Sequence, residues 1–395
     1  FWEVRAIENG WVRTLSASSE TVPYGGRSGI SFWQDGYGTM SEVTQKGATF
    51  RGQSAWNKRG VSIAEMRNMY ATLYDGEIFD GSATIVIPKS PEDLGALWHF
   101  CASLEFREAV AEVDKSIGKS TASLESVAFD PQLWRRVAAE AGPLPSPSAT
   151  DPTQWLFSGE PAKSSFPLQV GVARLLGYRW PEQKADELDR FVDRDGIASL
   201  QALPGEPELA TRLRELLAAA YGADWSGTLE RTLVAEAGGK NGRLEDWLRD
   251  TFFAQHVKVF ENRPFLWQIW DGRKDGFSAV VNYHRLDRKT LEKLTFTSLG
   301  AWIERQRHET AAGRAGADAR LAAAETLQQQ LKLILDGAPP HDVYVRWKAL
   351  YEQPIGWNPD LNDGVRVNIR PFVTAGVLRM KLDSKISWGK DRGNN

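Results

Sequence analysis

The densest group of side chains capable of chemistry lies between Asp246 and Asp287, DWLRDTFFAQHVKVFENRPFLWQIWDGRKDGFSAVVNYHRLD. Such a mixture of aromatic and hydrogen-bonding residues indicates either an active site or a core threaded by satisfied polar groups. The chain has no His-x-x-x-His or His-Glu-x-x-His pair that would place two histidines on one metal ion. The segment also contains no cofactor loop and no pairing of a nucleophile with a base. We therefore interpret it as the buried organiser of its domain, with His256, Asn282 and His284 as hydrogen-bonded core groups.

A basic segment, 45–67, has the composition of a surface that contacts a partner: QKGATFRGQSAWNKRGVSIAEMR contains five basic residues and the single acid Glu65. Lysine and arginine bind phosphates and make affinity dependent on salt. Glutamine and asparagine pair with the edge of adenine, arginine pairs with guanine, and an aromatic ring can stack on an unpaired base. The alternative is an ordinary solvated loop with Trp56 packed inward.

Two further patterns are open to a chemical interpretation. Pro359-Asp360 followed by Asp383-Ser384-Lys385 is similar to the metal-dependent nuclease pattern, in which two carboxylates bind Mg²⁺ and a lysine assists water. Residues 358–364, however, read as consecutive turns rather than the start of a core strand. Cys101 shares the apolar face of its expected helix and is interpreted as a small core residue. No phosphate-binding loop of the Gly-x-Gly-x-x-Gly or P-loop type follows a strand.

Composition limits the classes of protein further. With 395 residues, 42% hydrophobic and 25% charged, the chain is long enough for two or three domains. Its net charge of −3 excludes neither nucleic acid nor an acidic ligand. One cysteine excludes an internal disulfide and a cysteine-rich zinc site, so a cytoplasmic location is expected. No apolar run approaches the roughly 20 residues of a membrane span. The opening FWEVRAIENGW lacks Met and indicates part of a longer protein.

The hydrophobic periodicity predicts an α+β fold with four segments. Residues 1–142 are expected to form a mixed α/β domain, in which short strands precede a helix that starts at Ser90-Pro91. The proline-rich stretch 143–166 is the expected linker. Leucine spacing and terminal glycines predict a mainly helical domain over 167–342. The remainder, 343–395, is expected to be an extended, basic segment that packs on the rest.

Several segments together resemble one family. WDGRKDGFSAVVNYHRLD, LGAWIERQR, RLAAAETLQQQLKLILDG, VYVRWKAL and QPIGWNPDLNDGVRVNIRPF resemble the C-terminal half of large adenine-specific DNA methyltransferases of BREX and DISARM phage-defence systems, relatives of fused restriction–modification methylases. RGQSAWNKRGVSIAEM and LYDGEIFDGSATIVIPKSPEDLGALWHFCASLEFREAVAEVD are similar to their target recognition domain. The resemblance implies that 1–142 is the target recognition domain and 167–342 a helical accessory domain.

The sequence also departs from this family, because it lacks two of the family's motifs. The S-adenosylmethionine loop and the Asn/Asp-Pro-Pro-Tyr/Phe motif that receives a flipped adenine are both missing, since the one Asn-Pro continues as Asp-Leu. The chain is therefore expected to hold no cofactor, metal or catalytic residue and to be inactive alone, with S-adenosylmethionine bound by an upstream catalytic domain. Its expected partners are double-stranded DNA, that catalytic domain and other phage-defence proteins, with no membrane.

Side-chain chemistry selects the expected DNA contacts, because recognition residues vary within such a family. The main candidates are Arg51, Gln53, Trp56, Asn57, Lys58 and Arg59, and the weaker ones are Tyr24 and Arg27. Expected backbone contacts are Lys46, Arg273, Lys274, Lys385, Lys390 and Arg392. Two rival functions stay open: a nuclease that uses Asp360, Asp383 and Lys385, and a protein-interaction scaffold of a defence complex.

Overall fold

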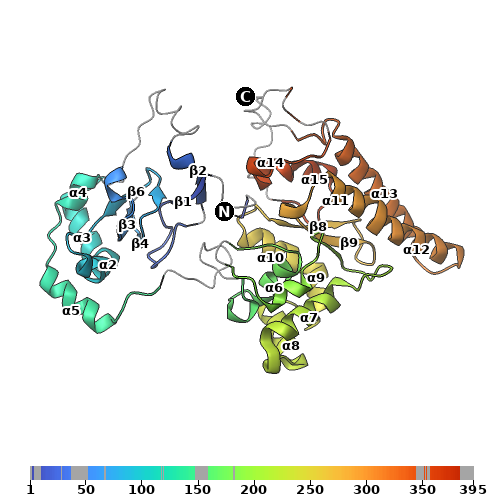
Figure 1. Cartoon of the computed structure of the whole chain (residues 1–395), viewed down its shortest axis with the longest axis horizontal. Coiled ribbons are helices and arrows are strands. Elements are labelled where there is room, and N and C mark those ends of the chain that lie inside the picture. The colour runs from blue at the N-terminus through green and yellow to red at the C-terminus, as the bar shows by residue number, and fades with distance from the viewer. Residues whose placement is uncertain are drawn as a thin grey trace. The chain divides into compact units, whose positions relative to one another are not determined.

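The computed structural model describes residues 2–3, 10–27, 29–36, 52–65, 68–116, 118, 120–146, 159–180, 183–343, 351, 353 and 356–382. The chain divides into two compact units (Figure 1). The first unit is formed mainly by residues 6–149, and the second by residues 158–395 together with 2–5. Both helices and small sheets are present, which confirms the α+β prediction. In the described part of the chain, no helix combines the length and the apolar character needed to cross a membrane.

Two three-stranded sheets form the framework of the first unit. Their strands are β1 (Trp11–Leu15), β2 (Gly29–Phe32), β3 (Gly60–Ala64), β4 (Ala71–Tyr74), β5 (Ile78–Phe79) and β6 (Ala83–Val86). In one sheet, β1 lies between antiparallel β2 and parallel β5. In the other, β3 lies between β4 and β6, both antiparallel to it. Because β3 and β4 are buried along their whole length, this second sheet can support a layer of helices on one face.

Three of the four described helices of the first unit begin at a residue whose side chain caps them. The four helices are α2 (Leu94–Ala102), α3 (Leu104–Val113), α4 (Thr121–Glu125) and α5 (Pro131–Ala141). Ser103 accepts a hydrogen bond from the amide of Phe106, and Asp130 caps α5. The helix predicted at Ser90 begins as a 3₁₀ turn, Pro91–Asp93, without a side-chain cap. Helix α2 packs on β3 and β4, and Cys101 on this helix is confirmed as a core residue, with burial raising the pKa of its thiol to about 12.

Ten helices of the second unit surround a sheet that the sequence did not predict. They are α6 (Pro167–Leu175), α7 (Leu209–Tyr221), α8 (Gly227–Glu236), α9 (Leu244–Asp250), α10 (Phe252–Val259), α11 (Arg288–Glu292), α12 (Leu299–Ala311), α13 (Ala317–Asp336), α14 (Val365–Asn368) and α15 (Arg370–Ala375), counted over the described residues. Strands β7 (Ile197–Ser199), β9 (Ser278–Asn282) and β8 (Leu266–Trp270) form an antiparallel sheet in that order. Both faces of β9 are buried, so its apolar run lacks the alternation that identifies a half-exposed strand.

The expectation of an extended segment from residue 343 is wrong for α14 and α15. The alternation of Val365, Val367 and Ile369 with polar residues is typical of a strand, yet all three are buried around short helical turns. Pro371 occupies the first turn of α15, and Gly376 ends it in the left-handed conformation. Beyond this glycine the chain is extended: the amide of Trp270 donates to Val377 O, and the amide of Arg379 donates to Gln268 O. This stretch therefore adds to the edge of β8.

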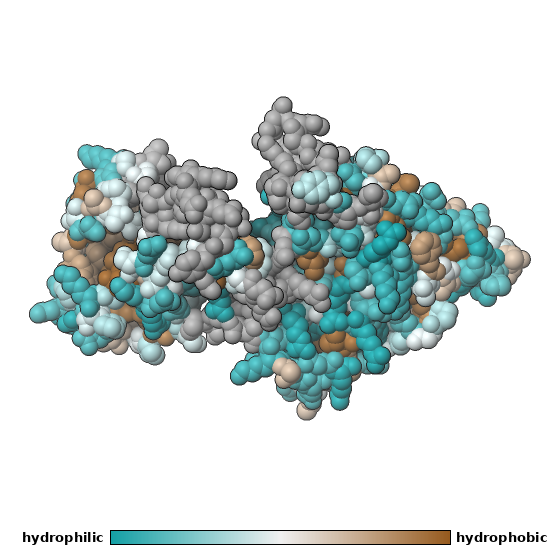
Figure 2. Space-filling view, turned by 45° about the horizontal axis from the view of Figure 1, so that its top comes forward, coloured by the Kyte–Doolittle hydropathy of each residue, from teal (hydrophilic) through white to brown (hydrophobic). Residues whose placement is uncertain are grey.

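Hydrophilic residues dominate the face of the second unit seen in Figure 2, where hydrophobic residues occur only in small groups. The exposed large hydrophobic side chains of the described residues are few, and only two of them, at opposite ends of α3, share an element: Phe32, Leu104, Val113, Phe296 and Tyr351. Isolated exposed apolar residues of this kind are ordinary on protein surfaces. Polar and charged side chains are thus the groups available for contacts.

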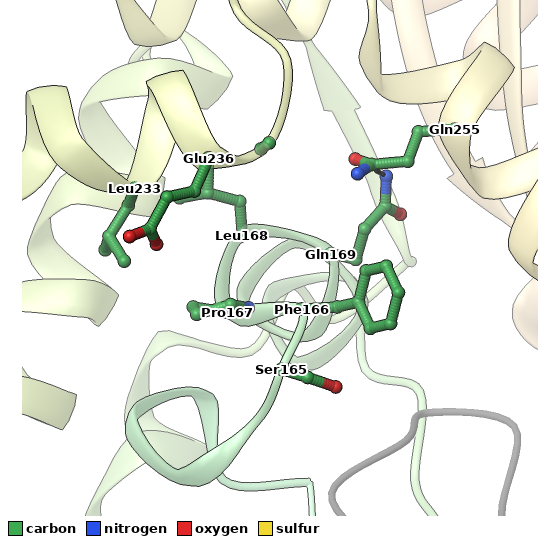
Figure 3. Close-up of a pocket in the computed structure, with 9 residues that line it drawn as sticks. Ser165, Phe166, Pro167, Leu168, Gln169, Leu233, Glu236 and Gln255 are labelled. Atoms are coloured by element: carbon green, nitrogen blue, oxygen red, sulfur yellow. Dashed lines mark hydrogen bonds between the residues drawn. The ribbon is translucent and has the colours of Figure 1, made fainter.

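A chain of buried hydrogen bonds joins the sheet to helices α6 and α10. The amide of Leu266 donates to His256 Nε2 (3.1 Å), which leaves the proton on Nδ1 to be donated to Gln169 Oε1 (3.0 Å). The Gln169 amide nitrogen in turn donates to Gln255 Oε1 (3.0 Å), and Figure 3 shows these two amides facing each other beside a cavity of about 70 Å³. Asn282 donates to Leu176 O, and His284 Nε2 donates to Trp2 O. The segment Asp246–Asp287 is therefore confirmed as a buried organiser.

The neutral state of His256 makes stability depend on pH. Burial lowers the pKa of His256 from 6.5 to about 3. Below pH 6.5 the unfolded chain gains a proton that the folded chain does not, so the free energy of unfolding falls by about 1.4 kcal/mol per pH unit from this residue. We expect wild-type protein to lose more stability between pH 6.5 and pH 5 than His256→Gln, measured by urea unfolding with tryptophan fluorescence. His308→Gln, at an exposed position of α12, should keep the wild-type slope. Equal slopes for wild type and His256→Gln would contradict the assignment.

Candidate nucleic-acid interface

The loop Gly52–Gly60, which leads into β3, is anchored to the first unit at several points. Gly52 has a φ of +76°, and a Cβ atom there would lie 2.1 Å from the Phe79 ring. The 3₁₀ turn Gln53–Ala55 follows, with Ala55 buried. Only glycine combines this backbone conformation with this close approach. The start of the loop is therefore fixed by contact with β5.

The middle of the loop is held by Trp56 and Asn57. The Trp56 ring meets the ring of Trp33 edge-on, with centroids 5.4 Å apart. Asn57 adopts the left-handed conformation (φ 60°), which asparagine tolerates better than most residues, and its amide donates to Gly76 O (3.0 Å). Trp56 is half-buried on Trp33, which gives it a packing role. Neither Trp33 nor the turn at Gly76 was recognised from the sequence as a support for this loop.

The side chains of Gln53, Asn57, Lys58 and Arg59 are exposed on this anchored backbone. Within the described residues, the first three make no side-chain hydrogen bond, so their donors and acceptors face solvent. Arg59 Nε donates to Asp75 Oδ1 at 2.9 Å, and this bond raises the pKa of Arg59. The ion pair is largely exposed and therefore worth at most about 1 kcal/mol, so a phosphate can compete for the guanidinium. The structure thus places four of the sequence-derived candidates on one short loop.

Tyr24 and Arg27 have structural roles in this unit. Arg27 is 4% exposed, and it donates to Glu77 Oε1 (2.7 Å) and to Leu73 O (2.6 Å). Tyr24 is also buried and donates to Pro145 O (3.1 Å), and burial raises its pKa. The carboxylate that holds Arg27 lies 50 positions further along the chain, so no local pattern separated this arginine from an exposed one. We leave both residues out of the interface.

A groove of about 600 Å³ lies beside the loop. Trp33, Trp56 and Phe79 contribute aromatic walls. Glu65, Asp80 and Glu125 contribute carboxylates, and its described lining contains no lysine, arginine or histidine. No described cation forms an ion pair with these carboxylates, and carboxylates repel phosphate, so the described part of the groove is unsuited to a nucleic-acid backbone. Any duplex that uses the loop must be held by its outer side chains.

The remaining candidates are dispersed. In the second unit, Arg273 donates to Asp275 through Nε (3.0 Å), and the neighbouring Lys274 is exposed. Asp360 is exposed, and its backbone carbonyl accepts from Asn368 (2.9 Å). Over the described ranges, no group of three or more His, Cys, Asp or Glu residues could hold a metal ion. The other candidates lie outside the described residues: Lys46, Arg51, Asp383, Lys385, Lys390 and Arg392.

Comparison with known proteins links the chain to an adenine-specific methyltransferase. No protein-family model matches it. It is 34% identical over 92 residues to the adenine-specific methyltransferase PglX of Lacticaseibacillus casei (strain Zhang). The match covers 21% of this chain and 7% of the relative, so the two share only a small part of the larger protein. The similarity supports a relation to methyltransferases of this kind.

The anchoring of the loop leads to a stability prediction. Gly52→Ala forces a Cβ atom into the Phe79 ring at a positive φ, so we expect a loss of about 2 kcal/mol in the free energy of unfolding. Gly81→Ala, with nothing within 4 Å of the added Cβ, is the matched control and should change it by less than about 0.5 kcal/mol. Urea unfolding of the whole chain measures both. Equal effects of the two substitutions would show that the loop is not anchored at Gly52.

Proposed function

We propose that this chain is the sequence-recognition and accessory part of an adenine-specific, S-adenosylmethionine-dependent DNA methyltransferase of a bacterial phage-defence system. It binds double-stranded DNA through the loop Gly52–Gly60 and positions the target adenine for a catalytic domain. The observation that carries the proposal is the set of four exposed polar or cationic side chains on one anchored loop. The partial similarity to an adenine-specific methyltransferase supports the type of partner.

In this proposal, the four side chains make two kinds of contact with DNA, to base edges and to phosphates. Gln53 and Asn57 present amides that can pair with the two hydrogen-bonding atoms of an adenine edge in the major groove. Lys58 and Arg59 supply positive charge for phosphates, which fixes the register of the duplex. Because the backbone is held at Gly52, Trp56 and Asn57, little conformational entropy is lost when the loop meets DNA.

Methyl transfer is assigned to a catalytic domain outside this chain. The sequence has neither the glycine-containing loop for S-adenosylmethionine nor an Asn-Pro-Pro-Tyr/Phe motif to receive a flipped adenine. Its residues therefore do not fit the cofactor. The contribution of this chain is to bind and orient DNA.

Duplex binding by loop variants tests the proposal. Lys58→Ala with Arg59→Ala should weaken binding of all duplexes and reduce the slope of log K against log salt by roughly 0.9 for each phosphate that the variant no longer neutralises. Gln53→Ala with Asn57→Gly, which keeps the left-handed backbone at residue 57, should leave that slope unchanged but reduce sequence preference, at about 1–3 kcal/mol for each base that is no longer paired by an amide. Fluorescence anisotropy gives the affinities, and selection from randomised duplexes gives the preference.

The matched control is Lys115→Ala with Arg136→Ala, which also removes two exposed cations from the first unit. It should change binding only slightly. If this control weakens binding as much as the Lys58 and Arg59 pair does, the attraction is non-specific and the loop is not the interface. The proposal is also contradicted if the wild-type chain binds no duplex at low salt.

A further inference from the structure

The second unit contains a cavity of about 580 Å³ that the proposed function does not use. Its wall is formed by the loop after α6, the turn before β7, the turn after β9 and the stretch around Pro359. Arginine side chains from three of these loops line it: Arg179, Arg194 and Arg285. Such convergence of guanidinium groups was not apparent from the sequence, where the three residues lie far apart.

Arg285 is held in place by backbone groups alone. Its Nε donates to Gly177 O (3.3 Å), and its Nη1 donates to Asp193 O (3.3 Å) and Arg194 O (3.0 Å). Gly177 and Gly196 have positive φ angles, and a Cβ atom on either would lie within 3.0 Å of the Arg285 side chain. Carbonyl groups orient the guanidinium without neutralising it. Arg285 is therefore a positioned cation that forms no ion pair with a described carboxylate.

The charges around the cavity do not cancel. Arg179 is neutralised by Asp189 at 2.9 Å, and Asp195 is neutralised by Lys293. The Asp287 carboxylate remains negative and accepts from the amide of Thr290 as the cap of α11. Arg194 is exposed and forms no side-chain bond with a described residue. Counted over the described residues that line the cavity, two cations, Arg194 and Arg285, thus face one anion, which leaves a net charge of +1.

We propose that this cavity binds a phosphate group through Arg194 and Arg285. A guanidinium offers paired N–H donors that match two phosphate oxygens, and a pre-oriented arginine loses little entropy on binding. The phosphate can belong to the backbone of a bound DNA or to a free phosphorylated small molecule. This site is independent of the loop Gly52–Gly60, which lies in the other unit.

Titration of the whole chain with inorganic pyrophosphate, followed by calorimetry, tests the site. Arg194→Glu reverses an exposed charge without breaking a described side-chain bond, so it should fold and lower pyrophosphate affinity at least ten-fold. Arg314→Glu, on the exposed turn between α12 and α13, makes the same charge change away from the cavity and should retain affinity. Thermal denaturation checks that both variants are folded.

A parallel titration with duplex DNA identifies the source of the phosphate. Loss of duplex affinity in Arg194→Glu but not in Arg314→Glu assigns the cavity to the DNA backbone, and unchanged duplex affinity assigns it to a free phosphorylated ligand. The proposal is overturned if pyrophosphate does not bind, or if Arg194→Glu and Arg314→Glu bind it equally. Variants of Gln53 and Asn57 report on the loop alone, so failure at one site leaves the other test intact.

Discussion

The second unit depends on buried hydrogen-bonding side chains that have to find partners when it folds. A polar group taken from water into an apolar core costs free energy unless a hydrogen bond replaces its hydration. His256 can be satisfied only if Gln169 on α6 and the amide of Leu266 on β8 are both in place. Distant parts of the chain must therefore assemble together. The same requirement ties Trp2 to this unit, because its carbonyl accepts from His284 and its indole donates to Arg263 O.

The loop Gly52–Gly60 of the first unit obeys a different constraint. Its backbone is held by close contacts at Gly52, Trp56 and Asn57, while its outer side chains make few bonds. Within nine residues, inward groups thus fix the position of the backbone, and outward side chains stay exposed. Arg59 is intermediate between the anchored groups and the unbonded side chains. Its exposed ion pair with Asp75 orients the guanidinium at little cost in free energy.

Local signals predicted part of the local structure. The left-handed glycine cap at Gly337 ends α13 where the leucine pattern stops, whereas Ser90, the predicted start of a helix, makes no side-chain cap bond. Features decided by tertiary packing could not be predicted in this way. Strand β9 is buried on both faces and so carries no alternation, whereas the alternating residues 365–369 are helical. Burial overrode periodicity in both cases.

Prediction of the candidate sites from the sequence was limited for the same reason, since tertiary packing decides which side chains are exposed. Composition identified the basic segment, and the structure places Gln53, Asn57, Lys58 and Arg59 together on its exposed side. A charged residue, however, does not reveal its own burial: Arg27 is inside the unit because Glu77 and the carbonyl of Leu73 receive it there. The arginines around the second-unit cavity come from three separate loops, so their convergence could not be predicted from the sequence.

Electrostatics restricts how a duplex can use the first unit. The exposed side chains of Lys58 and Arg59 attract phosphate, whereas Glu65, Asp80 and Glu125 in the neighbouring groove repel it. In the proposed complex, the DNA backbone therefore stays on the outer side of the loop, where the side chains of Gln53 and Asn57 are also exposed. Repulsion by the acidic groove would disfavour other orientations of the duplex. The proposal thus requires attraction on the loop and repulsion in the groove to act together.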